Sequence, residues 1–162
     1  MTDRTRGTLG SAAIGSLAGI AAALVMSALM IAGKRAGLMP EHPPEEIARA
    51  ALSIDGSAPD EELTEPLAAV LHLGFGAAMG AAFGVIHRFT QPIAPAAVQG
   101  VLFALGTWAV SYLGWVPALG IMPRADRDVP GRQPVMIAAH VVYGAVLGSI
   151  VGLDRGPARP GA

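Results

Sequence analysis

The chain has 162 residues, of which 52% are apolar and only 14% charged, with a net charge of −1 and no cysteine. Soluble proteins carry about 25% charged residues, so the composition excludes an ordinary soluble domain. The missing cysteines exclude disulfides, thiolate chemistry and cysteine-ligated metals. The near-neutral charge also argues against a nucleic-acid partner.

The charged residues are segregated, and they leave four uncharged tracts at residues 7–33, 66–86, 89–123 and 133–153. Each tract provides about the 20 apolar residues that a helix needs to cross a hydrocarbon core of about 30 Å. A soluble helical bundle would instead carry charged side chains along its outer faces. The sequence therefore predicts an all-α fold, a bundle of four transmembrane helices in one integral membrane domain covering residues 1–162.

The first predicted helix covers about residues 9–33, after a short polar segment. Its first half carries Gly10, Gly15 and Gly19, a small-residue face of the kind that lets another helix backbone approach closely. We expect this face to be exposed on the outside of the bundle. It would then be available to a second copy of the chain.

An acidic segment, residues 41–65, follows, with eight carboxylates and a single Arg49. Pro43 and Pro44 precede the run EEIARAAL, which predicts a short helix with acidic residues in its first turn, ended by Asp55 and Gly56. The second membrane helix is predicted to begin at Pro66, because a missing backbone N–H costs least at a helix start. We interpret the acidic segment as a solvated surface.

The third predicted helix covers about residues 96–116. Trp108, Tyr112 and Trp115 recur at helical spacing near its end, a pattern typical of aromatic anchors at a membrane interface. Pro117 is expected to bend or end this helix. The fourth helix begins at Pro134 by analogy with the second.

Two parts of the chain resemble each other. The pattern P-x5-H-x2-[FY]-G-A-x2-G-x3-G occurs at residues 66–84 and again at 134–152, with six identities in nineteen positions. The tetrapeptide G-[LI]-M-P follows both the first and the third predicted helix. We infer two parallel helical-hairpin repeats, about residues 9–86 and 96–153, related by a pseudo-twofold axis along the membrane normal.

The repeated pattern places His72 and His140 at the same depth, and we expect them to face each other or a common cavity. Behind each histidine the glycines at four-residue spacing predict close helix packing. These glycines are Gly76, Gly80, Gly84, Gly144, Gly148 and Gly152. The plainest interpretation of the two histidines is a hydrogen bond to a neighbouring helix, with no cofactor bound.

Two sharper interpretations remain open. Two neutral imidazoles at equal depth are suited to ligate a b-type haem or a metal in a redox module, and Met39, Met122 and Met136 near the same face make copper(I) a variant. A small transporter or channel is the other, since parallel repeats occur in transporters. The spans contain no Asp, Glu, Lys or Arg to couple transport to an ion gradient.

No motif of an enzyme active site is present, which predicts a protein without catalytic activity.

The last predicted helix contains Ala139-His140-Val141-Val142-Tyr143-Gly144, and the first is rich in glycine. In these features the chain resembles small bacterial inner-membrane proteins of the YagU-like kind. The resemblance implies a polytopic inner-membrane protein with no assigned catalytic residue. We therefore expect a structural or accessory component of the inner membrane, surrounded by lipid, with both termini cytoplasmic. A homodimer or another membrane protein is its candidate partner.

Overall fold

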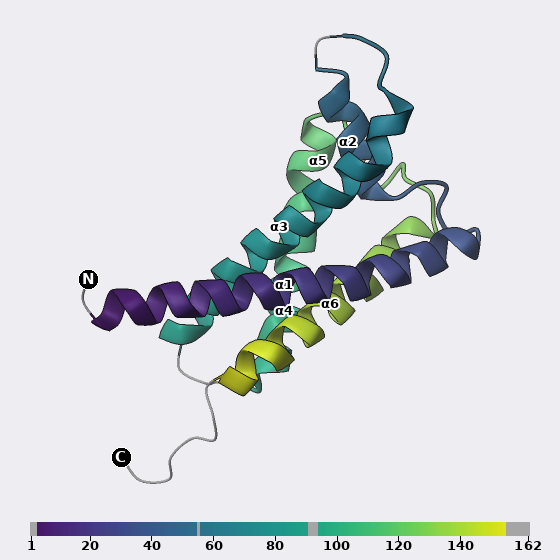
Figure 1. The fold of residues 1–162 in the computed structure, drawn as a ribbon. Helices are drawn as coiled ribbons and strands as arrows, with labels where there is room; N and C mark the ends of the chain where they lie inside the picture. The colour runs from purple at the N-terminus through teal and green to yellow at the C-terminus, as the bar shows by residue number, and fades with distance from the viewer. Residues whose placement is uncertain (1–2, 55, 91–93, 155–162) are drawn as a thin grey trace.

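A computed structural model describes the backbone of residues 3–54, 56–90 and 94–154, and the side chains of these ranges from residue 7 to residue 153. The described chain is helical, without a strand. Its elements are α1 (Asp3–Arg35), α2 (Pro43–Leu52), α3 (Glu61–Phe89), α4 (Ala96–Val110), the π-helical turn η1 (Ser111–Trp115), α5 (Val116–Ala118) and α6 (Arg132–Asp154). Figure 1 shows α4, η1 and α5 following one another as a single rod.

Four helical segments are long and apolar enough to cross a membrane: Gly7–Arg35, Glu61–Phe89, Ala96–Ala118 and Arg132–Leu153. They correspond to the four uncharged tracts, so the prediction of an all-α, four-span fold is confirmed. The short helix expected in the acidic segment is also present as α2. The start of α1 and the end of α6 lie at the end of the molecule away from α2 and α5 (Figure 1).

The helices pack in two pairs, α1 with α3 and α4 with α6, and glycines line both contacts. A Cβ atom added to Gly80 would overlap the carbonyl oxygen of Gly15. In the other pair, a Cβ atom at Gly148 would overlap the carbonyl oxygen of Ala96. The residues at offset 68 in the repeated pattern therefore meet their partner helices in the same way, with backbone against backbone.

The expectation that the glycine face of the first helix is exposed is wrong. Gly15 and Gly19 are buried against α3, and of the three glycines only Gly10 faces open space. The reason is that α3 carries the complementary glycines, so the small-residue face closes the contact inside one chain. The outer face of α1 is instead apolar and bulky, with Leu17 69% exposed and Leu24 56% exposed.

The two G-[LI]-M-P turns end their helices with the same cap. Gly37 and Gly120 adopt left-handed backbone conformations, with φ of 72° and 71°. In each turn the glycine N–H donates to the carbonyl three residues earlier, and the next N–H donates to the carbonyl five residues earlier. This pair of bonds is the Schellman motif, which favours glycine at the left-handed position. Met39 and Met122, two residues after each glycine, are buried.

The predicted helix starts are wrong in three places. α3 begins at Glu61, because the Asp60 side chain accepts a hydrogen bond of 2.9 Å from the N–H of Glu62, and the helix then continues through Pro66. Asp60 is the kind of residue that caps helices, and the acidic turn after it suits the positive end of the helix dipole. α6 likewise begins at Arg132, before Pro134, and α1 begins at Asp3.

Pro117 does not end the third helix at residue 116, since α5 extends to Ala118. The turn before it widens into η1, where the N–H of Val116 donates to the carbonyl of Ser111, five residues earlier. Such single-turn π-helices occur within α-helices and change the direction of the side chains that follow. Here the change lies beside the cavity described below.

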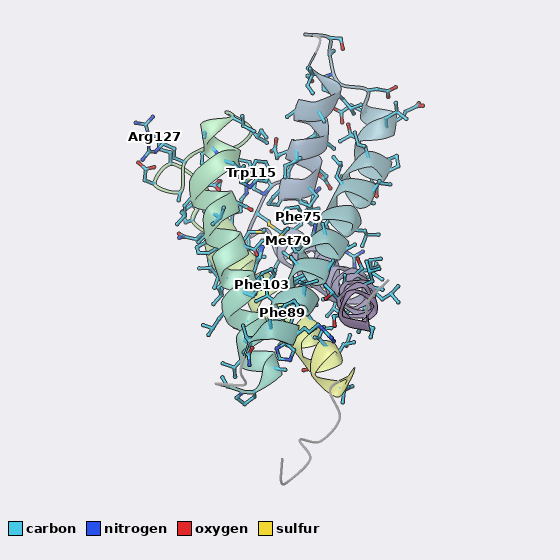
Figure 2. All side chains as sticks on the ribbon, turned by 90° about the vertical axis from the view of Figure 1, so that its left-hand side faces the viewer. Phe75, Met79, Phe89, Phe103, Trp115 and Arg127 are labelled. Atoms are coloured by element: carbon cyan, nitrogen blue, oxygen red, sulfur yellow. The ribbon has the colours of Figure 1, made fainter. Side chains whose placement is uncertain are left out.

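α1 and α6 join the two pairs, with Gly33 of α1 against Val135 of α6. α3 and α4, in contrast, meet closely at one end only and diverge toward the other. α3 and α4 contact each other through Phe83 and Phe103, whose ring centroids are 5.4 Å apart, and through His87 Nδ1 and Gln99 Oε1, which are 3.1 Å apart. Figure 2 shows α3 and the α4–η1–α5 rod separating from this end toward α2. The divergence leaves room between the pairs at the α2 end.

Candidate binding cavity

A cavity of about 240 Å³ lies between the diverging helix pairs. Its wall contains five methionines, five aromatic residues and two histidines, and within the described chain no Asp, Glu, Lys or Arg contributes to it. The methionines are Met26, Met30, Met79, Met122 and Met136. Phe75 and Met79 of α3 lie on one side of this space and Trp115 of η1 on the other (Figure 2). The site is therefore apolar, with a few polar atoms.

α2 covers the cavity at the loop end with Pro43, Pro44 and Ile47. The other side of α2 is charged and is held by ion pairs. Glu45 lies 3.2 Å from Lys34 at the end of α1, and Arg49 pairs with both Glu41 and Glu61. The acidic segment is thus more than a solvated surface, because its helix forms one wall of the cavity.

Glu46 of α2 and His42, the residue before α2, have pKa values that burial shifts. Burial raises the pKa of Glu46, and a hydrogen bond with Glu41 raises it further, against the smaller effects of Arg132 and Arg49. Burial lowers the pKa of His42, which also lies near Lys34 and, with the opposite effect, near Glu45. The docked position of α2 therefore favours the uncharged forms of both groups.

His72 and His140 both line the cavity, one from α3 and one from α6. His140 Nδ1 lies 2.8 Å from the carbonyl oxygen of Met136. Since a carbonyl only accepts, Nδ1 carries the proton and donates this bond, which leaves the Nε2 lone pair of neutral His140 unused. His72 faces the backbone of Ala23, and its Nε2 is buried without a hydrogen-bond partner in the described chain.

The soft-metal neighbours expected from the sequence are only partly brought together. Met122 and Met136 line the cavity with both histidines. Met39 is buried beside Gly33 and does not line it. Met26 and Met30 lie four residues apart on one face of a helix, and this spacing could have predicted that they line the same space. No comparable spacing in the sequence pointed to Met79. No group of three or more His, Asp or Glu side chains in the described ranges is arranged to hold a metal ion.

The aromatic residues predicted to anchor the third helix line the cavity, and their place at the membrane interface stays a prediction. Tyr112 is 5% exposed, and its ring stacks on Trp108 with centroids 5.6 Å apart. Trp115 lies at the rim and is 37% exposed. The spacing correctly placed all three on one side of the helix, but that side faces the other helix pair.

Tyr112 also belongs to a polar cluster that the sequence did not reveal. Its hydroxyl donates a 2.7 Å hydrogen bond to Asp128, and Arg132 donates another of 2.7 Å to the same carboxylate. The Asp128 and Arg132 side chains are 2% and 5% exposed. This buried ion pair joins the loop before α6 to the wall of the cavity.

The molecule is thus an all-helical protein with four candidate membrane spans and an apolar cavity between its two helix pairs. The chain belongs to a family of unknown function, DUF6789, whose family model matches residues 9–159. The match gives no support to the resemblance to YagU-like proteins. No curated protein and no solved structure matches the chain.

Proposed function

We propose that this protein is an accessory protein of the inner membrane that takes a small apolar molecule from the bilayer into the cavity between its helix pairs. The observation that carries the proposal is the cavity itself, about 240 Å³ of space walled by methionine and aromatic side chains from four spans and α2. Methionine side chains adapt to ligands of irregular shape, and aromatic rings provide large apolar contacts.

The volume supports an occupant of limited size. An engineered apolar cavity of about 150 Å³ binds benzene, whereas pockets for drug-sized ligands measure about 300–1,000 Å³. The cavity is half open to its surroundings, so a molecule from the surrounding lipid phase can fill it with one ring or a chain segment. The uncharged wall favours a neutral molecule.

Both tryptophans of the chain line the cavity, so fluorescence provides the test. In a Trp115→Phe variant the only tryptophan is Trp108, inside the wall, and excitation selective for tryptophan reports on it alone. We expect 1-bromodecane, added to the protein in lipid nanodiscs, to quench Trp108 through its bromine atom in a saturable manner. Thr107→Phe, which adds a ring to the wall, should weaken this quenching at least tenfold.

Val110→Phe is the matched control, because it adds the same ring to the same helix at a position that is 68% exposed. It should leave the quenching curve unchanged. The proposal fails when bromodecane quenches Trp108 linearly with its concentration in the lipid, with the same slope in Thr107→Phe and Val110→Phe. That result would mean that the probe acts from the bilayer and does not enter the protein.

The orientation belongs to the same proposal. We place both termini on the cytoplasmic side and α2 on the exported side, because the acidic segment resembles an exported surface. The counts of Lys and Arg on the two sides are nearly equal and give little guidance.

A soft-metal or haem site is the second candidate, and the gathering of five methionines with His72 and His140 favours it. Thioether and imidazole donors suit copper(I), whereas the cavity volume is small for a tetrapyrrole. The test is an absorbance spectrum of the purified protein, oxidised and reduced, with metal analysis of the same sample. Stoichiometric copper, or a Soret band, that disappears in His140→Leu would favour this candidate over the apolar ligand.

A further inference from the structure

We infer that the molecule bound in the cavity carries a hydroxyl group, as a neutral lipid alcohol or phenol does, and that His140 binds this group. The inference rests on the proposed function, because it names the chemical class of the ligand of the same cavity. It follows from the hydrogen-bonding state of the polar atoms in an otherwise apolar wall.

His140 provides an acceptor. Its Nδ1–H is already used by the carbonyl of Met136, one helical turn earlier on α6, at 2.8 Å. This bond fixes the tautomer, so Nε2 presents a lone pair and no proton. Within the described chain Nε2 has no hydrogen-bond partner. A ligand meets this nitrogen favourably only with an O–H or N–H group.

A hydroxyl group satisfies this requirement, since it has one proton to donate. An ether, ester or ketone oxygen would leave His140 without a donor, and so would a hydrocarbon. A carboxylate or an ammonium group would enter a wall that holds no opposite charge.

The experiment uses the Trp115→Phe protein in nanodiscs and measures how well three compounds displace 1-bromodecane from Trp108. Decan-1-ol, 1-methoxynonane and undecane have equal numbers of non-hydrogen atoms and differ in their ability to donate and accept. We expect His140→Leu to weaken displacement by decan-1-ol about tenfold, the value of one buried hydrogen bond, and to change the other two less than twofold. Comparing each compound with itself in two proteins removes its partitioning into the lipid.

The outcomes separate this inference from the proposed function. Without saturable quenching by bromodecane in the wild-type cavity, the proposed function fails and this inference with it. Where bromodecane binds but His140→Leu weakens all three compounds equally, or none, the ligand class is wrong and the cavity function stands. Should His140→Leu not assemble, the order in the wild-type cavity decides: displacement by 1-methoxynonane equal to that by decan-1-ol overturns the inference.

Discussion

Gly80 illustrates how a single missing side chain holds two helices together. Its Cα lies against the backbone of Gly15 and Gly19 on α1, and an added Cβ atom would overlap backbone atoms that cannot rotate away. We expect Gly80→Ala to force α1 and α3 apart and to cost about 1–3 kcal/mol of stability. The thermal midpoint in detergent, or the SDS concentration that unfolds the protein, measures this loss.

Gly74, six residues earlier on α3, is the matched control. It is exposed, and no atom lies within 4 Å of its would-be Cβ. Gly74→Ala should change stability by less than about 0.5 kcal/mol. Equal effects of the two substitutions would show that the backbones of α1 and α3 are farther apart than in the structure.

The sequence made several residues predictable and others not. His72 and His140 were expected to share a cavity because an identical pattern surrounds them, and both line it. Trp108 and Tyr112 were expected to share one face of the third helix, and they do, but helical spacing could not reveal that this face lines the cavity. Asp128 and Arg132 carried no signal, because a loop carboxylate and an arginine are usually solvated.

At the scale of elements, α2 gives the fold a dependence on pH. The raised pKa of Glu46 means that docked α2 favours the protonated carboxyl. Its contribution to stability is complete below the ordinary value of 4.5 and is lost as the pH rises through the raised pKa. The lowered pKa of His42 acts oppositely: its contribution is complete above 6.5 and is lost as the pH falls toward the lowered value.

We therefore expect Glu46→Gln to remove the loss of stability above pH 4.5 while leaving the loss caused by His42 below pH 6.5. Thermal midpoints of both proteins in one detergent, measured between about pH 4 and pH 8, test this. Glu62→Gln, at an exposed position in the first turn of α3, should keep the wild-type profile. A Glu46→Gln profile parallel to that of the wild type would contradict the assignment to Glu46.

The buried ion pair between Asp128 and Arg132 secures the start of α6 beside the cavity. Asp128→Ala would leave the Arg132 guanidinium, which is 5% exposed at its side chain, without its anion. Removing one partner of a buried ion pair typically costs about 3–5 kcal/mol. We expect a loss of this size in thermal or SDS unfolding, partly recovered in the Asp128→Ala/Arg132→Met double variant, which buries no charge.

The same loop provides a control. Asp126 and Arg124 form an ion pair of 3.5 Å whose side chains are 66% and 77% exposed. Exposed pairs contribute about 0–1 kcal/mol, so Asp126→Ala should have almost no effect. If both alanine variants behave alike, the Asp128 side chain is solvated and not buried.

For the whole molecule, the four spans were predictable because length and the lack of charge are properties of consecutive residues. The cavity was not, because it depends on the divergence of α3 and α4, which touch at Phe83 and Phe103 and separate toward α2. The helix start at Glu61 was missed for a local reason: the prediction relied on Pro66 and overlooked Asp60, which caps the helix six residues earlier. Tertiary packing and capping decided what periodicity left open.

The arrangement of the four spans predicts which parts of the chain share a side of the membrane. The natural chain has no cysteine, so single cysteines report accessibility without background. Ile54, after α2, is 85% exposed, and Leu119, after α5, is 70% exposed; both lie at the loop end of the molecule. Leu153, near the end of α6, is 81% exposed at the opposite end.

With four spans, Ile54→Cys and Leu119→Cys must react alike with a membrane-impermeant maleimide on intact cells, and Leu153→Cys must react oppositely. Labelling of the first two and protection of the third would place α2 on the exported side, as proposed. The reverse would keep the four-span arrangement and invert the orientation, whereas labelling of Ile54→Cys but not Leu119→Cys would contradict the arrangement itself.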